Sequence, residues 1–281
     1  MDAKMLFKQL DQDFDLDNCE DKWVMDFNEY ISENFKQRHM GLLVDNTEEV
    51  DYVYTAVFPS DKVLKEILEV NKKNSLLLTH HPMVWDIRNT PRVFFDISLD
   101  LLEKFKQRQI SIYTLHTPLD KNGEYSTTVN WAKGLEITQE KEFFEYYGVK
   151  VGIFGKTKFQ RVQELAKNVS KVVSHEIKLF EYGNDKIKDC KVALVAGGGN
   201  EIDVLKEIAE EGVNVFITGI TALNDYSRKA HKFAKENRIN IIGATHYSTE
   251  KFACLAMCDY FKNLGLPCEF IEDKPILEDL E

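Results

Sequence analysis

The chain alternates between short apolar runs and longer segments whose apolar residues recur at helical spacing. Apolar runs predict strands at 50–59, 75–81 and 110–116. Between them, residues 60–74 and 94–109 have the spacing of amphipathic helices, and Ser60 is placed to cap the first of these helices. Strands joined by helices of this length predict crossover connections and a mainly parallel sheet.

The second half of the chain repeats this alternation with a separate set of elements. The predicted strands are 149–155, 176–183, 191–197 and 213–219, and the predicted helices are 160–173 and 201–212. A strand at 238–244 and a helix at 249–265 complete the pattern. We therefore predict an α/β fold of two interwoven lobes with mainly parallel or mixed sheets. Residues 1–125 and 238–281 form one lobe, and residues 126–237 form the other.

Four of the seven histidines follow predicted strands: His80, His81, His116 and His246. Loops at the carboxyl ends of parallel strands aim side chains into one crevice, where open α/β sheets bind their ligands. Two of these segments add a carboxylate four residues later, Asp120 in "HTPLD" and Glu250 in "HYSTE". In a helical turn each such pair lies on one face. The sequence therefore predicts a metal site at the carboxyl ends of the strands.

Imidazole and carboxylate ligands suit Zn, Mn, Fe, Co or Ni. Adjacent histidines that face opposite ways can each hold a different ion, and a carboxylate can bridge two ions about 3.5–4 Å apart. Such a pair lowers the pKa of bound water towards roughly 7, which makes hydroxide available without a serine or cysteine nucleophile. We expect two divalent ions per subunit.

Each motif has a simpler explanation when it is taken alone. In the His80–His81 pair, one ring could bond a backbone carbonyl while the other is solvated. "HTPLD" fits a turn, and the helix dipole favours a glutamate in the first turn of a helix. The coincidence of three motifs at successive strand ends favours metal binding, and the sequence has neither the H-x-H nor the HExxH pattern of other metalloenzymes.

The charge and composition of the chain disfavour some classes of function. The formal net charge of −11 disfavours nucleic-acid binding through phosphates. No apolar stretch is long enough to cross a bilayer, the N-terminus lacks the order of a signal peptide, and five scattered cysteines fit a reducing compartment. We expect a cytoplasmic protein. Cys254 and Cys258 share a helix face without a second ligand pair nearby, so we expect them to fill the core.

These motifs resemble those of a known family, the Nif-three-like dinuclear metal-centre proteins, also called type 2 GTP cyclohydrolase I homologues. The segments that carry the resemblance follow the family's order: "MGLLVD" (40–45), "THHPMVW" (79–85), "LHTPLDKNGEYSTTVNWAKGL" (115–135), "VALVAGGGN" (192–200), "VFITG" (215–219) and "GATHYSTE" (243–250).

The resemblance implies that five residues are metal ligands: His80, His81, Asp120, His246 and Glu250. Glu250 is the expected bridge. His116 is either a further ligand or a group behind the ligands, and we favour a catalytic role for it in proton transfer. The resemblance also implies a two-lobed subunit and a ring-shaped homohexamer whose sites face an internal cavity.

Three loops depart from the family pattern. "AVFPS" (56–60) stands where relatives continue the first strand into an aspartate, "GGGN" (197–200) replaces Gly-Gly-Ser-Gly, and Ile220 replaces a frequent acidic residue. None of these changes removes a proposed metal ligand, so we expect them to affect which substrate is bound. "GGGN" is either a tight strand-to-helix turn or an anion cradle, and its spacing favours the turn.

The sequence thus favours a metal-dependent hydrolase whose hydroxide attacks a small, nucleotide-like substrate, with the type 2 GTP cyclohydrolase I label coming from the resemblance. The alternative is a non-enzymatic metal-binding regulator or metal carrier that acts through protein partners. A nucleic-acid scaffold is disfavoured by the acidic charge.

Overall fold

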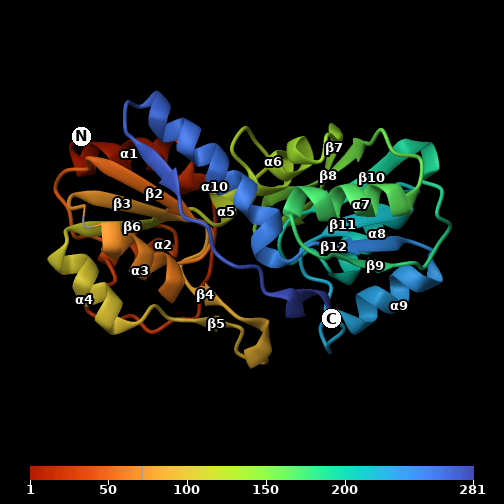
Figure 1. The fold of residues 1–281 in the computed structure, drawn as a ribbon, viewed down its shortest axis with the longest axis horizontal. Helices are drawn as coiled ribbons and strands as arrows, with labels where there is room; N and C mark the ends of the chain where they lie inside the picture. The colour runs from red at the N-terminus through yellow and green to blue at the C-terminus, as the bar shows by residue number, and fades with distance from the viewer. Residues whose placement is uncertain (71) are drawn as a thin grey trace. The chain divides into compact units, whose positions relative to one another are not determined.

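The computed structural model of the chain describes residues 1–70 and 72–281. It contains two large β-sheets, each packed against helices (Figure 1). The chain divides into two units. The first comprises Met1–Leu119 and Cys254–Lys274, and the second comprises Asp120–Ala253 and Pro275–Glu281. The prediction of an α/β fold with parallel and mixed sheets is confirmed.

The first unit is built on a five-stranded sheet in the order β1-β6-β3-β2-β13. Its strands are β1 (Gly41–Val44), β2 (Tyr52–Ala56), β3 (Ser75–Thr79), β6 (Ile110–Thr114) and β13 (Cys268–Phe270). β1 runs antiparallel to β6, and the other pairings are parallel. β4 (Val84–Trp85) and β5 (Phe94–Phe95) pair separately.

Helices cover both faces of this sheet, so every residue of β3 and β6 is buried. In Figure 1, α3 and α4 lie below the sheet and α1 lies above it. Ser60 caps α3 as predicted, since its Oγ accepts a hydrogen bond from the Val63 amide at 3.2 Å. The helices are α1 (Ala3–Asp13), α2 (Glu33–Arg38), α3 (Asp61–Val70), α4 (Leu99–Gln107), and the short η1 (Leu16–Asn18) and η2 (Ile87–Asn89).

The second unit has a six-stranded sheet in the order β7-β8-β10-β11-β12-β9, whose three central strands β10, β11 and β12 are parallel. The strands are β7 (Thr138–Tyr146), β8 (Val149–Lys156), β9 (Lys178–Phe180), β10 (Lys191–Val195), β11 (Val215–Thr218) and β12 (Asn240–Gly243). Trp131 and Leu165 belong to the hydrophobic core of this unit.

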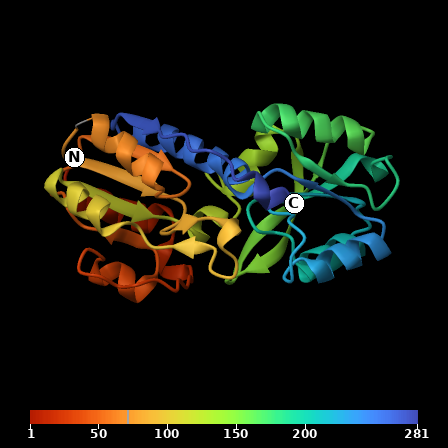
Figure 2. The ribbon, with the colours of Figure 1, turned by 60° about the horizontal axis from the view of Figure 1, so that its bottom comes forward.

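Figure 2 shows α7 above this sheet and α9 below it. The helices of the second unit are α6 (Thr127–Gly134), α7 (Val162–Val173), α8 (Ile202–Glu210), α9 (Arg228–Glu236), and the short η3 (Lys188–Cys190) and η4 (Leu277–Leu280). Two helices contain a boundary between the units: α5 (Thr117–Asp120) and α10 (His246–Asn263).

The last predicted strand and helix belong to different units. Sequence analysis put both in the first lobe, whereas β12 pairs in parallel with β11, with Ile241 opposite Phe216, and so belongs to the second sheet. Only the part of α10 from Cys254 onwards belongs to the first unit. An apolar run predicts a buried strand but carries no information about which sheet will accept it.

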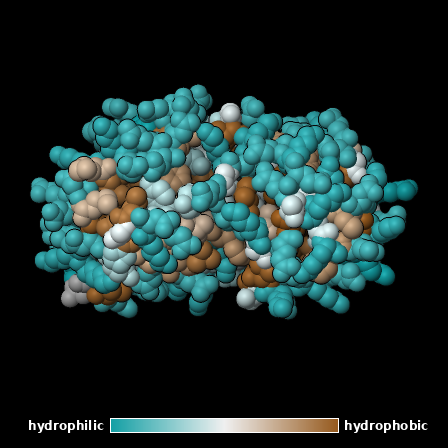
Figure 3. Space-filling view, turned by 90° about the horizontal axis from the view of Figure 1, so that it is seen from above, coloured by the Kyte–Doolittle hydropathy of each residue, from teal (hydrophilic) through white to brown (hydrophobic). Residues whose placement is uncertain are grey.

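β7 and α9 of the second unit were not predicted because their apolar pattern is weak. β7 has one buried residue, Phe143, and α9 buries Ala230, His231 and Ala234. The face drawn in Figure 3 is largely hydrophilic, in keeping with the high charge content. Among the described residues, no helix combines the length and the apolar character that a membrane span requires.

Candidate metal centre

The end of β3 places two histidines side by side in the first unit. β3 ends at Thr79, and the amides of His80 and His81 then donate to the carbonyls of Ala56 (3.1 Å) and Val57 (2.9 Å). Both side chains are buried, at 0% and 1% exposure. The interpretation in which one of the two rings is solvated is therefore wrong.

Each of these rings is held by a neighbour. The Nδ1 of His80 lies 3.0 Å from the Leu115 carbonyl oxygen, so it donates there and leaves Nε2 as the nitrogen able to bind a metal. The ring of His81 stacks on Phe58, with centroids 4.6 Å apart and an interplanar angle of 18°. The centroids of the two imidazoles are 4.4 Å apart.

His116 follows β6 and joins the same cluster, with its ring centroid 4.8 Å from that of His81. Its Nδ1 lies 2.9 Å from Oδ2 of Asp21, a carboxylate whose side chain is 1% exposed. Burial alone would raise the pKa of Asp21, but the charge and hydrogen bond of His116 outweigh it and hold that pKa below its usual value. Trp23 packs edge-on against His116, with centroids 4.8 Å apart.

The first unit therefore presents three buried imidazoles that could hold a metal ion. One ligand atom from each of His80, His81 and His116 lies within 4.8 Å of the others. Neutral imidazole is the commonest protein ligand for transition metals, and a carboxylate behind one of the rings raises its basicity and fixes its tautomer. The chemistry of this donor set fits the divalent metal expected from the sequence.

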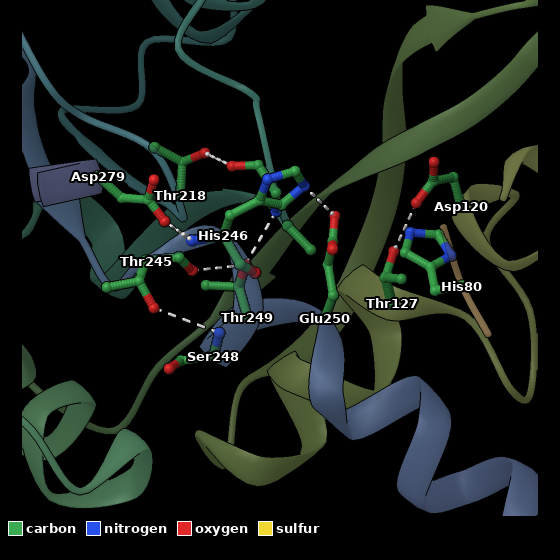
Figure 4. A network of polar contacts seen from close by, with 12 residues as sticks. His80, Asp120, Thr127, Thr218, Thr245, His246, Ser248, Thr249, Glu250 and Asp279 are labelled. Carbon is green, nitrogen blue, oxygen red and sulfur yellow. Dashed lines mark hydrogen bonds and ion pairs between the residues drawn. The ribbon is translucent and has the colours of Figure 1, made fainter. Parts of the chain in front are cut away.

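In the second unit, the junction of β12 and α10 presents His246 and Glu250. β12 ends at Gly243, Thr245 takes a left-handed backbone conformation with φ +64°, and α10 begins at His246. Asp279 of η4 accepts a hydrogen bond from the His246 amide at 2.8 Å (Figure 4). A buried carboxylate at a helix N-terminus satisfies free amides and complements the helix dipole.

His246 and Glu250 lie on one face of α10, as their spacing predicted. The Nε2 of His246 is 3.1 Å from Oε1 of Glu250, and both side chains are buried (Figure 4). Asp120, at the end of α5, accepts a hydrogen bond from Thr127 Oγ1 at 3.1 Å. The second unit thus presents one imidazole and two carboxylates.

The glycine-rich segment after β10 packs against the start of α10. The Gly197 amide donates to Thr249 Oγ1 at 2.9 Å, and the Gly197 carbonyl accepts from the Gly219 and Ile220 amides. A Cβ at Gly197, where φ is +65°, would lie 2.2 Å from Oε1 of Glu250. This glycine therefore makes the room that the Glu250 carboxylate occupies.

Asp21, Asp279 and Gly197 are site residues that the sequence patterns did not indicate. Asp21 lies beside Glu20 in an irregular segment, and nothing in the local pattern distinguishes these two acids. Asp279 is near the C-terminus, 33 residues after its partner. Gly197 was considered only as part of a turn or an anion cradle.

Comparison with known proteins places this chain in a family. The model of the Duf34/NIF3 (NGG1p interacting factor 3) family matches residues 28–275. The chain belongs to the Duf34/NIF3 family. The resemblance found in the sequence is confirmed.

Several curated proteins similar to this chain carry one name. The "GTP cyclohydrolase 1 type 2 homolog" of Pyrococcus horikoshii is 29% identical over 83% of this chain and 88% of its own length. The protein of that name from Borreliella burgdorferi is 29% identical over 85% of this chain and 89% of its own. These similarities extend over most of both chains.

Solved structures share the Duf34/NIF3 fold over nearly the whole chain. A protein titled ybgI, of unknown function, has a TM-score of 0.76 at 21% identity and covers 98% of this chain and 100% of its own. The protein TTHA1606 from Thermus thermophilus has a TM-score of 0.71 at 24% identity, with 98% and 99% covered. At these identities the likeness establishes the fold.

Proposed function

We propose that this Duf34/NIF3 chain is a metal-dependent hydrolase with a dinuclear metal centre. The observation that carries the proposal is the buried trio of His80, His81 and His116 at the ends of β3 and β6, with ligand atoms within 4.8 Å of one another. Three buried imidazoles whose ligand atoms lie this close together form a donor set that suits a divalent transition-metal ion.

Five residues would hold the two ions: His80, His81, Asp120, His246 and Glu250. Imidazole and carboxylate donors of this kind suit divalent transition metals. Glu250 would serve as the carboxylate shared by the two ions, as the resemblance implies.

The proposed chemistry divides between the ions and the side chains. Two divalent ions, when bound, activate a water molecule and neutralise negative charge that develops on the substrate. The Asp21 carboxylate holds the Nδ1 proton of His116, so that His116 Nε2 is left to accept or deliver a proton at the reacting group. Phe58 and Trp23 fix the rings of His81 and His116 and exclude water around them.

The substrate class rests on the names of the relatives. Because two curated relatives are called GTP cyclohydrolase 1 type 2 homolog, we propose a small nucleotide-like substrate, with a purine ring carbon as the electrophile. The departures in "AVFPS" and "GGGN" bear on which member of that class is accepted.

Metal content tests the centre directly. Protein purified without chelators is analysed for transition metals and then titrated calorimetrically with Mn or Zn. Two equivalents per chain support the proposal, and no binding even after reconstitution contradicts it. Glu250→Gln should lose the binding, whereas Glu164→Gln, an exposed glutamate of α7, should retain it.

Turnover tests the hydrolase. The metal-loaded protein is assayed against a panel of nucleotides and phosphoesters, with His81→Ala and Glu250→Gln as the inactive variants. Hydrolysis that both variants abolish supports the mechanism. Activity that survives in either variant excludes it.

A regulatory role is the second candidate, and the family description favours it by naming an interacting factor. In that case the same side chains bind metal reversibly, turnover is absent, and the loaded chain binds a protein partner more tightly than the metal-free chain. Assaying turnover and partner binding on one metal titration separates the two candidates.

We also propose that the chain works in the cytoplasm as a ring-shaped homohexamer. No disulfide joins the five cysteines of the described residues, which suits a reducing compartment. Light scattering on the purified protein tests the assembly, and a monomeric mass at working concentration contradicts it.

A further inference from the structure

Two cysteines outside the candidate metal centre face each other between α10 and β13 in the first unit. The thiol of Cys268 donates to the sulfur of Cys258, with the two Sγ atoms 3.3 Å apart. Both residues are free thiols. Because a disulfide holds its sulfurs about 2.05 Å apart, the pair needs to approach by roughly 1.2 Å to bond.

Regular elements hold both thiols in place. Cys258 lies 3.3 Å from Thr55 Oγ1, and one turn earlier in α10 Cys254 donates to the Ala56 carbonyl. Cys268 begins β13 and stands opposite Val53 in the parallel pairing with β2. The proximity of the two sulfurs therefore comes from a packed helix and a paired strand.

The two thiols differ in exposure and in acidity. Cys258 is 5% exposed, while Cys268 is half-buried on the edge strand of the sheet. The hydrogen bond from Cys268 lowers the pKa of Cys258 to about 7; burial opposes this, and Thr55 and Lys262 assist it. The same contact, with burial, raises the pKa of Cys268. One sulfur is thus available as a thiolate near neutral pH.

We propose that Cys258 and Cys268 form a redox-active dithiol that closes to an intramolecular disulfide when the protein meets a hydroperoxide. The Cys258 thiolate attacks one peroxide oxygen, an S–O bond forms, and the O–O bond breaks; the departing oxygen takes a proton and leaves as water. The Cys268 sulfur then attacks the sulfenic sulfur of Cys258, and the S–O bond breaks. The released oxygen takes the Cys268 proton and leaves as a second water. Two electrons pass from the two thiols to one hydrogen peroxide.

The disulfide would fasten the middle of α10 to the edge strand β13. α10 also carries His246 and Glu250 in its first two turns, but Cys258 lies about two turns beyond Glu250, and the dithiol uses none of the proposed metal ligands. The dithiol proposal therefore does not depend on hydrolysis, and either proposal can fail without the other.

The test uses the folded, fully reduced chain. It is treated with hydrogen peroxide, the remaining thiols are alkylated, and the cysteines are mapped by mass spectrometry. We expect two of the five thiols to disappear, a Cys258–Cys268 cross-linked peptide with the mass of two hydrogens fewer, and full return of both thiols with dithiothreitol. Cys258 and Cys268 that remain alkylatable, or a cross-link to another cysteine, would overturn the proposal.

Two variants sharpen the result. Cys268→Ser should leave the sulfenic acid of Cys258 unresolved, so that dimedone labels it. Cys190, like Cys268, is half-buried, and the Cys190→Ser variant should form the Cys258–Cys268 disulfide like the unmodified chain. Dimedone labelling of Cys258 that is no greater in Cys268→Ser than in Cys190→Ser contradicts the role of Cys268. The cross-link map of the unmodified chain tests the proposal even where a variant does not fold.

Discussion

Three buried imidazoles of the first unit are each held by a different kind of neighbour. His80 bonds a backbone carbonyl, His81 stacks on Phe58, and His116 bonds the Asp21 carboxylate. Each contact restricts one ring before any ion arrives, so metal binding would cost little further side-chain ordering. Substitution of the residues that hold these rings should therefore affect metal binding, as substitution of the proposed ligands should.

Asp21→Asn should weaken metal binding and activity while leaving the fold intact. The amide keeps the shape of the carboxylate but loses its charge, and loss of such a partner typically costs roughly 10–100-fold in metal affinity or activity. Calorimetric titration with Mn or Zn measures the affinity, and Glu20→Gln, the exposed neighbour, is the matched control. Equal affinities for the two variants would show that Asp21 does not act through His116.

Gly197→Ala should damage the centre through Glu250. Alanine at positive φ costs about 1–2 kcal/mol of stability, and here its Cβ would also lie 2.2 Å from Glu250 Oε1. Gly148→Ala is the control, since φ is +77° and nothing lies within 4 Å of the added Cβ. Urea unfolding should show both variants destabilised, but metal binding should be weakened in Gly197→Ala alone. Unchanged metal affinity in Gly197→Ala would refute the contact.

At the scale of elements, a single carboxylate connects α8 to two strands of its sheet. Glu211 follows α8 and accepts hydrogen bonds from Lys141 of β7 at 2.6 Å and from Lys191 of β10 at 2.7 Å. These two bonds lower the pKa of Glu211 to about 2 from its ordinary 4.5. The side chains of β7 are mostly exposed, so β7 buries little apolar surface, and the ion pair of Lys141 with Glu211 attaches it to α8.

The contribution of Glu211 to stability should disappear in acid. Because its pKa is lower in the folded chain, the contribution is complete above pH 4.5 and is lost as the pH falls through about 2. Exposed pairs of this kind contribute about 0.2–1 kcal/mol each. Urea midpoints measured across that range should fall less steeply for Glu211→Gln than for Glu210→Gln, an exposed neighbour. Parallel profiles would rule out the link.

At the scale of the whole molecule, the proposed ligands are divided between the two units. His80 and His81 belong to the first unit, whereas Asp120, His246 and Glu250 belong to the second. Ions that bind these residues only in the folded chain would stabilise it relative to the unfolded chain. Metal occupancy should then change global stability.

Removal of metal should lower the melting temperature. An ion that binds the folded chain alone stabilises it by about 2.7 kcal/mol at 100 times its Kd. Calorimetry with Mn or Zn, followed by chelator, should show a reversible shift that Glu250→Gln lacks and Glu164→Gln keeps. A melting temperature that does not respond to metal in the unmodified chain would contradict the proposed metal centre.

Local spacing in the sequence was enough to predict most strands and helices, the positions of the histidines after strands, and the shared face of His246 and Glu250. Each of these depends on residues within a few positions of one another, where the periods of helix and strand decide which side chains are neighbours. The family could also be predicted, because its motifs are short and contiguous.

Tertiary structure alone decided which distant segments meet. His116 bonds Asp21 across 95 positions, Gly197 makes room for Glu250, β12 joins the second sheet, and the Cys268 thiol meets Cys258. In the sequence, Asp21 cannot be distinguished from the neighbouring Glu20, because only tertiary packing buries Asp21 beside His116. Such pairings are selected by the free energy of the folded core as a whole, which local periodicity does not contain.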